Sequence, residues 1–392
     1  MNHTKYLATV LASSLLAIST AAAGQEGAIE IEKQAGPGRE RPILVSLTGF
    51  TGEATHVLQF DLYVQGFAVA DEQSAQYLIN GSNNGNLQGR VTDRVTKNVK
   101  LAKAYSGASV RRQAHAFIDD FVQVLGRKPI GNTKLAFKGQ NGSNGEIFIA
   151  DFDGFGAQQV TRDNTIVAAP CMVPGHLAMY YTSYKLNHPD IFHQNLSTGD
   201  RTIFARFGGS NMSPAVSPDG SKVAMILSKD GWTDLYVCNS DRSDLRRLTK
   251  SRQDESSPCW SPDGQWICYA SKDNERRSLS KISVSGGAAH RIPTNGVGNP
   301  SEPDWSPDGK WIAFTSQGRD FSICVVPSTG GDATVLTAGE DPSWSPNSRT
   351  LAFARRQGGQ YVLSLLDAPT KQVKDVSRTS GSSSQSQPSW AR

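Results

Sequence analysis

Short apolar runs separated by polar turns repeat along the last two thirds of the chain. Four of them, at 223–225, 267–269, 312–314 and 351–353, each follow a turn that contains proline and either glycine or serine. Runs of this length, bounded by turn residues and rich in β-branched and aromatic side chains, predict strands.

One heptapeptide precedes these runs. Residues 214–220 read Pro-Ala-Val-Ser-Pro-Asp-Gly, and the pattern returns at 258–264, 303–309 and, more loosely, 342–348. Its serines, at 217, 261, 306 and 345, are 44, 45 and 39 residues apart, which is the period of a propeller blade. Proline sets the first corner of a turn, aspartate bonds its own backbone, and glycine accepts the left-handed exit. We therefore expect Ser-Pro-Asp-Gly to join two antiparallel strands.

The repeat predicts a closed ring. Two degenerate units extend it toward the N-terminus, so that the second strands begin at 135, 177, 223, 267, 312 and 351. The first unit lacks an inner Pro-x-Trp strand, and the chain ends with a spare one, Pro388-Ser389-Trp390. We predict a mainly β protein with a six-bladed β-propeller at 131–392, in which the C-terminal strand completes the first blade and leaves no open edge.

Residues 24–130 carry no repeat and predict a small α/β domain. Strands are expected at 30–32, 42–47, 77–79 and 99–101, and a helical face at 54–62. The clearest helix is 110–125, with an apolar stripe at 3.6-residue spacing that ends before Gly126 and Pro129.

The first 23 residues have the features of a secretory signal peptide. Lys5 precedes an apolar run at 6–18, and small residues follow up to Ala23, where we expect cleavage. The alternative, a membrane anchor, fits less well because the run is shorter than the roughly 20 residues of a spanning helix. The prediction is an exported, periplasmic protein that associates with the envelope only peripherally.

Composition and motifs argue against several functions. The formal charge of +4 is not concentrated in a basic stripe, which disfavours nucleic-acid binding. Propeller hydrolases carry a Gly-x-Ser-x-Gly elbow, which this sequence lacks. His188 and His193 have no acidic partner pattern, so we predict neither a metal site nor a cofactor, and no catalytic residues. The five cysteines have no disulfide or zinc spacing, and only Cys259 and Cys268 flank one turn closely enough to pair.

The tryptophans divide into two groups. Trp260, Trp305, Trp344 and Trp390 occupy the same blade position and are expected to pack between blades. Trp232 departs from the pattern and is a candidate for surface contact.

The ends of the innermost strands should surround the mouth of a central channel. The dipeptides at 168–169, 212–213, 256–257, 301–302, 340–341 and 386–387 are small or polar, and partly acidic. One interpretation is loop ends that are simply solvated, and the other is a polar funnel for a protein loop. The residues predicted to bind a partner are Ser210, Asn211, Ser213, Glu255, Ser256, Ser257, Glu302 and Asp341.

A signal peptide, a small α/β domain and six blades closed by a terminal Pro-x-Trp resemble the TolB family of the Tol-Pal system. Residues 111–120 and 131–137 are similar to that family's last N-domain helix and first blade, and 206–224 to its third blade. The blade motif alone occurs in many bacterial propellers. Residues 87–105 depart from the family pattern.

The resemblance implies an adaptor that is not an enzyme. It implies that the channel mouth binds the peptidoglycan-associated lipoprotein Pal, or a Pal-like lipoprotein, and that the mature N-terminus engages a TolA-like inner-membrane protein. By position, Ser210, Asn211, Ser213 and Ser256 fall where family members meet Pal, although the amino acids differ from the family's usual ones. Roles in outer-membrane integrity and in constriction at cell division follow by the same resemblance. The alternative is an exported propeller enzyme or carbohydrate-binding protein.

Overall fold

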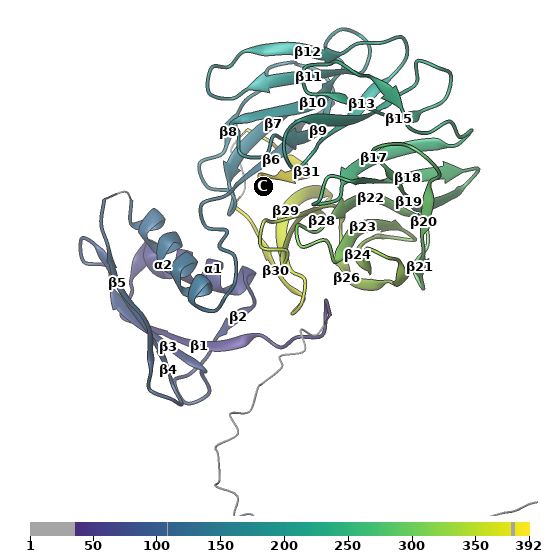
Figure 1. Cartoon of the computed structure of the whole chain (residues 1–392). Helices are drawn as coiled ribbons and strands as arrows, with labels where there is room; N and C mark the ends of the chain where they lie inside the picture. Colours follow the sequence, from purple (N-terminus) through teal and green to yellow (C-terminus); the bar gives the residue numbers. More distant parts are fainter. Residues whose placement is uncertain (1–35, 108, 378–380) are drawn as a thin grey trace, which may run out of the picture. The chain divides into compact units, whose positions relative to one another are not determined.

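Two secondary-structure patterns divide the chain of the computed structural model, which describes residues 36–107, 109–377 and 381–392. The predicted signal peptide and the strand expected at 30–32 lie outside the described residues. Figure 1 shows the two patterns along the sequence, an α/β region followed by β-sheets. None of the helices in the described part of the chain is both long and apolar enough to span a membrane.

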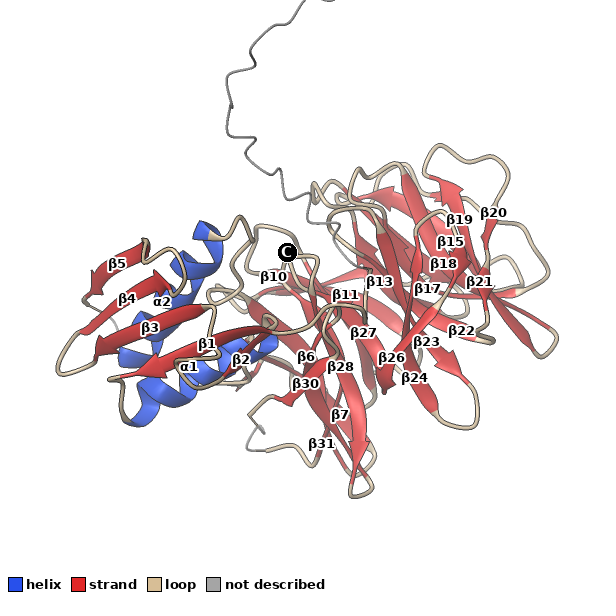
Figure 2. Cartoon of the chain, turned by 90° about the horizontal axis from the view of Figure 1, so that it is seen from below, coloured by secondary structure: helices blue, strands red, loops and turns tan. Residues whose placement is uncertain are grey.

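The α/β region has one five-stranded sheet in the order β2-β1-β3-β4-β5, in which β1 runs parallel to both of its neighbours. Both helices contact this sheet and each other (Figure 2). Its elements are β1 (Ile43–Thr48), α1 (Gly52–Val64), β2 (Phe67–Val69), β3 (Tyr77–Ser82), β4 (Leu87–Asp93), β5 (Val99–Tyr105) and α2 (Val110–Val124).

The helix predicted at 110–125 is confirmed within one residue. The Ser109 side chain accepts the Arg112 backbone N–H at 3.3 Å and so caps its first turn. Its apolar stripe, including Phe117 and Phe121, is buried against the sheet. The sequence pattern did not predict β2 and β4. Phe67, Leu87 and Val91 are buried in the core of this region, but β2 has only three residues and the apolar residues of β4 alternate with glycine and polar residues.

The rest of the chain forms the six predicted blades, each a four-stranded sheet. Blade 1 consists of β31 (Ser384–Trp390), β6 (Lys134–Asn141), β7 (Asn144–Asp151) and β8 (Gln158–Gln159). Blade 2 consists of β9 (Val167–Met172), β10 (Ala178–Ser183), β11 (Asp190–Asn195) and β12 (Arg201–Ala205). Blade 3 consists of β13 (Asn211–Val216), β14 (Lys222–Leu227), β15 (Asp234–Asn239) and β16 (Arg246–Arg247).

Blade 4 consists of β17 (Asp254–Trp260), β18 (Trp266–Asp273), β19 (Arg276–Ser283) and β20 (His290–Ile292). Blade 5 consists of β22 (Pro300–Trp305), β23 (Trp311–Gln317), β24 (Phe321–Pro327) and β26 (Thr334–Ala338). Blade 6 consists of β27 (Glu340–Trp344), β28 (Thr350–Gln357), β29 (Gln360–Asp367) and β30 (Gln372–Asp375). A two-residue parallel pair, β21 (Thr294–Asn295) with β25 (Gly331–Asp332), links blades 4 and 5 at their edges.

The C-terminal strand closes the ring as predicted. β31 pairs antiparallel with β6, and Trp390 lies opposite Leu135. The Trp390 indole N–H donates to Thr133 Oγ1 at 2.8 Å, and its backbone N–H donates to Ser343 Oγ of blade 6 at 3.0 Å. Residues more than 240 positions apart are thereby joined in one sheet.

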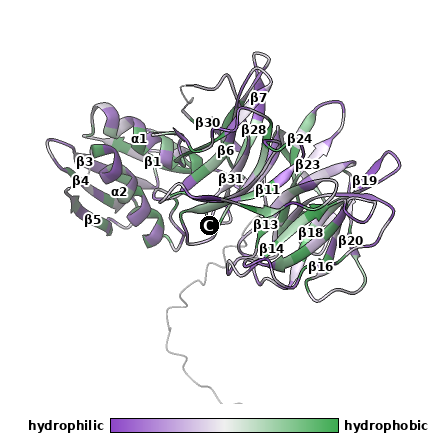
Figure 3. Cartoon of the chain, turned by 90° about the horizontal axis from the view of Figure 1, so that it is seen from above, coloured by the Kyte–Doolittle hydropathy of each residue, from purple (hydrophilic) through white to green (hydrophobic). Residues whose placement is uncertain are grey.

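The repeated turn works as its chemistry predicts. Ser217 Oγ donates to Asp219 Oδ1 at 2.6 Å, and Asp219 Oδ1 accepts the Ser221 backbone N–H at 3.0 Å. Equivalent serine contacts recur with Asp263, Asp308 and Asn347. Between the blades, the strands bury apolar side chains, and Figure 3 shows hydrophobic stretches along strands such as β14 and β18.

The four predicted packing tryptophans are all buried, whereas Trp232 is 47% exposed. All five cysteines are free thiols. Cys259 and Cys268 lie directly opposite each other on β17 and β18, and remain unpaired.

Candidate functional site: the central channel

The innermost strands of all six blades enclose a cavity of about 770 Å³. Its walls extend from the N-terminal ends of these strands to the Ser-Pro-Asp-Gly turns, for example from Ser213 to Asp219 in blade 3. A volume of this size lies within the range of roughly 300–1,000 Å³ typical of ligand sites. The N-terminal ends form what we call the mouth.

A ring of six residues with left-handed backbone marks the mouth. Each belongs to a different blade, immediately precedes a proline, and has φ between +49° and +56°. These residues are Ala169, Ser213, Ser257, Glu302, Asp341 and Gln387.

Such a conformation is uncommon for residues other than glycine, and a following proline normally favours extended backbone. In every blade the register between the inner and second strands shifts at this point. The six residues are therefore β-bulges, which bend a strand and re-aim its side chains. Strained backbone of this kind costs on the order of 1–3 kcal/mol per residue and is concentrated at functional sites.

Side chains of this ring hold one side of it together. Gln387 Oε1 accepts the Ala169 backbone N–H at 2.9 Å, and Asp341 Oδ2 accepts the Gln387 backbone N–H at 3.0 Å. Glu302 Oε2 in turn accepts the Asp341 backbone N–H at 3.2 Å. Each of these side chains thus binds the bulge of the next blade.

The opposite side of the mouth has short side chains. The Ser213 backbone N–H donates to Thr182 Oγ1 at 3.2 Å, just as the Asp341 N–H donates to Thr315 Oγ1 at 3.0 Å. The difference is that the preceding bulge residue is Ala169, whose methyl group cannot accept a hydrogen bond. Ser213, Ser257 and Met212 are half-buried and line the cavity. This sector is therefore neutral and open to contact.

Blades 5 and 6 give the mouth an acidic sector. Burial, followed by the charges of Glu302 and Glu340, raises the pKa of Asp341 well above its usual range. Burial and the Glu302 charge also raise the pKa of Glu340. A positive or hydrogen-bond-donating group from a partner would relieve this repulsion.

The predicted partner-binding residues fall into two groups. Ser213, Ser257, Glu302 and Asp341 line the channel cavity. Ser210, Asn211, Glu255 and Ser256 are not among its lining residues. The bulges explain the split, because each adds a residue to its strand and shifts the alternation of inward and outward side chains.

Two residues of the second group have internal contacts. Asn211 is fully buried, and its side chain accepts the Phe207 backbone N–H at 2.9 Å and donates to the Phe207 carbonyl at 3.0 Å. Glu255 is buried too, and it accepts the Leu235 backbone N–H at 3.0 Å and the Ser251 hydroxyl at 2.9 Å. Burial raises the pKa of Glu255. Both side chains support the loops that lead into the mouth.

The structure adds Thr182 and Tyr184 to the wall of the channel. Thr182 lies on β10, the second strand of blade 2, and Tyr184 follows that strand. The sequence pattern predicted neither of them as a wall residue. The sequence does contain a feature that favours this position. Ala168 and Ala169 are the smallest residues among the six strand ends, so side chains of the second strand can reach the channel there.

Within the part of the chain that the structure describes, no group of three or more histidine, cysteine or acidic side chains could hold a metal ion. The geometry of the channel, with its neutral hydroxyls, acidic sector and backbone bulges, is suited to binding through hydrogen bonds and charge.

Comparison with known proteins agrees with this architecture. Residues 121–392 match the family described as TolB beta propeller domain. The TolB homologue of Chlorobium luteolum is 33% identical over 175 residues, which are 44% of this chain and 39% of that protein. The Tol-Pal system protein TolB of Bordetella pertussis is 30% identical over 281 residues, 70% of this chain and 64% of that protein. The matched part thus spans less than two thirds of these relatives.

A solved structure extends the likeness in fold. TolB from Acinetobacter baumannii superposes with a TM-score of 0.80 at 22% sequence identity, covering 91% of this chain and 98% of that one. With the propeller family matched over more than half of its length, the chain belongs to the TolB family.

Proposed function

We propose that this protein is a periplasmic adaptor of the Tol-Pal system, not an enzyme, and that the mouth of its channel binds a Pal-like lipoprotein. Family membership supports the system, since one relative is named as a Tol-Pal protein. The observation that supports the mouth as the binding site is the ring of six bulges around a cavity of about 770 Å³.

The two sectors of the mouth suit a protein loop as partner. The serine side offers hydroxyl groups beside Met212. The side formed by blades 5 and 6 offers carboxyl groups, and burial raises the pKa of one of them, Asp341. A loop that brings a backbone N–H group or a basic side chain to Asp341 would bind the acidic sector, and the rest of the same loop could form hydrogen bonds with the serine hydroxyls. In this proposal the adaptor supports outer-membrane integrity and constriction at cell division.

The second partner in this proposal is a TolA-like inner-membrane protein, which would bind the segment that follows the signal peptide. Removing residues 24–35 is expected to abolish that binding and to leave lipoprotein binding in place. Pull-down with each purified partner checks this, and binding of the TolA-like protein by the shortened chain contradicts it.

Calorimetric titration tests the mouth directly. The purified periplasmic domain of the lipoprotein is titrated into the wild-type protein and into Ser213→Trp, which places an indole at the mouth. We expect at least a tenfold weaker Kd, about 1.4 kcal/mol or more, because the bulky ring occupies the partner's space.

Ser285→Trp is the matched control. Ser285 is an exposed turn residue of blade 4 outside the cavity lining, so the same substitution should leave the Kd unchanged. Equal Kd values for Ser213→Trp and the wild type would move the site away from the mouth. Absence of binding by the wild type would overturn the adaptor proposal.

A further inference from the structure

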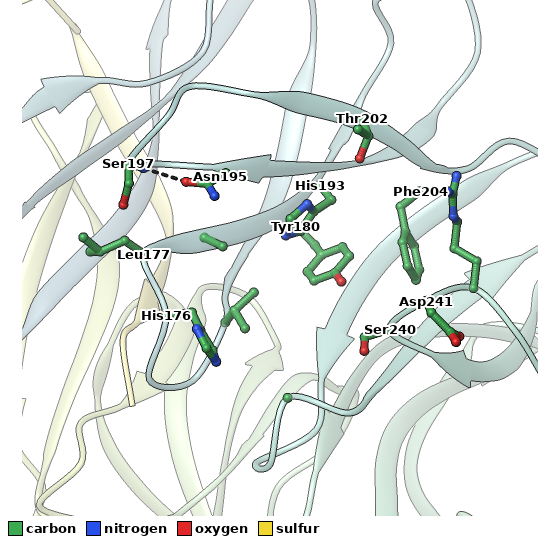
Figure 4. A pocket seen from close by; sticks show the side chains of 14 residues that line it. His176, Leu177, Tyr180, His193, Asn195, Ser197, Thr202, Phe204, Ser240 and Asp241 are labelled. Atoms are coloured by element: carbon green, nitrogen blue, oxygen red, sulfur yellow. Dashed lines mark hydrogen bonds between the residues drawn. The ribbon is translucent and has the colours of Figure 1, made fainter.

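A second cavity, of about 670 Å³, lies outside the channel, where blade 2 meets the turns of blade 3 (Figure 4). Three of its wall residues are cross-strand neighbours. Tyr180 on β10 lies opposite His193 on β11, which lies opposite Thr202 on β12. Their side chains therefore project from one face of the blade 2 sheet. We call this cavity the seam pocket.

Blade 2 departs from the repeat at the seam pocket. Tyr180 and His193 form one register pair between the second and third strands. The equivalent pairs in the other blades are Ala136 with Ile149, Ala224 with Val237, Cys268 with Lys281, Ala313 with Val325 and Ala352 with Leu365. Only blade 2 has two aromatic rings there, and they lie 4.8 Å apart between centroids.

Blade 3 departs from the repeat on the facing side. In each blade, the residue after the third strand donates its backbone N–H to the turn that precedes the second strand. In four blades this residue is apolar and packs into a core cluster, namely Phe152, Leu196, Val284 and Ala368. Blade 3 has Ser240 at this position, and blade 5 has Ser328. An apolar plug is therefore missing from the seam between blades 2 and 3.

The walls combine aromatic rings with neutral hydrogen-bonding groups. Tyr180 and Phe204 meet edge to face at 4.8 Å. Burial lowers the pKa of His193, so its imidazole is neutral at pH 7 and offers one donor and one acceptor. Among the described residues, the side chains of His193, His176 and Thr202 have no hydrogen-bond partner in the protein.

The two charged side chains of the seam pocket do not favour a charged ligand of either sign. Asp241 and Arg242 carry opposite charges and stand side by side in one turn. Asp241 accepts the Ser243 hydroxyl at 2.6 Å, and Arg242 donates to the Ile203 carbonyl at 3.2 Å. Both are therefore held by groups of the protein.

We propose that the seam pocket is a binding site for a neutral saccharide. A pyranose ring has an apolar C–H face, which suits aromatic side chains, and a rim of hydroxyls that donate and accept hydrogen bonds. His176 and Thr202 are exposed and His193 is half-buried in the free protein. A purely apolar ligand would cover these groups without offering them hydrogen bonds, which is unfavourable. The cavity volume lies within the range typical of ligand sites.

Saturation-transfer NMR with three disaccharides tests this assignment. Maltose, cellobiose and N,N′-diacetylchitobiose are each added to the full mature protein. We expect at least one of them to receive saturation from the wild type and to bind with a Kd of about 1 mM or tighter. The double variant His193→Val with Ser240→Val introduces residues that other blades carry at these positions, and should weaken that binding at least tenfold.

Ser328→Val, at the equivalent turn of blade 5, is the control and should bind the saccharide as the wild type does. An unchanged denaturation midpoint shows that the double variant is folded, and its Kd for the lipoprotein should not change. No transfer to any of the three saccharides, or equal binding by the double variant, overturns the proposal. A seam pocket that responds to a tryptophan-containing peptide and to none of the saccharides overturns the ligand class.

Discussion

Asp119, on helix α2, has a carboxylate in a position that disfavours its charge. Its Oδ1 accepts the Gly131 backbone N–H at 2.8 Å, but burial raises its pKa to about 6, and the charge of Asp61 adds to the rise. The ordinary value is 3.8. The folded protein therefore holds this proton more tightly than the unfolded chain. The resulting stability is fully present below about pH 4 and is lost as the pH rises through 6.

Asp119→Asn is expected to unfold at a higher temperature than the wild type at pH 7.5, because asparagine keeps an acceptor for Gly131 without the charge. The gain should be about 1–3 kcal/mol and should disappear at pH 4. Thermal unfolding followed by circular dichroism at both pH values measures it. Asp71→Asn is the control with the opposite sign, since the Ser74 backbone N–H lowers the pKa of Asp71. A gain of equal size at both pH values would contradict the account.

Strand β31 is the element on which ring closure depends. Trp390 is only 3% exposed and contacts blades 1 and 6 through its two N–H groups. Trp390→Ala should lower the free energy of unfolding by about 3–5 kcal/mol, through lost burial and a cavity.

Chemical denaturation of the two proteins measures this loss. Trp232→Ala is the matched control and should change the free energy by less than about 0.5 kcal/mol, because Trp232 is 47% exposed. Similar losses for both substitutions would mean that β31 does not stabilise the ring.

Elements whose causes are local could be predicted from the sequence. The Ser-Pro-Asp-Gly turns and helix α2 depend on residues that are close together in the sequence. The closing strand could be predicted because the chain ends with a Pro-x-Trp motif that the first blade lacks. The bulges at Ser213 and Asp341 could not be predicted, because a register shift depends on the partner strand. For the same reason the pattern grouped Glu255 with Ser257, although only Ser257 lines the channel.

At the scale of the whole molecule, an approximate sixfold repeat carries two departures from symmetry. The mouth keeps one backbone conformation in all six blades and varies the side chains from serine to glutamate. The seam pocket exists because blade 2 alone has the ring pair of Tyr180 and His193, and because the facing blade 3 has Ser240 where four other blades have an apolar residue. Comparing the blades position by position would have revealed this second departure from the sequence alone.

Site-specific photocrosslinking in living cells tests the binding mouth most directly. A photoreactive amino acid replaces Met212, which lines the mouth, and in a second strain replaces the exposed turn residue Ser285. We predict that position 212 crosslinks to an envelope lipoprotein with a peptidoglycan-binding domain, and that position 285 does not. A lipoprotein crosslink from position 285 with none from position 212 would contradict the proposal that the mouth binds this partner.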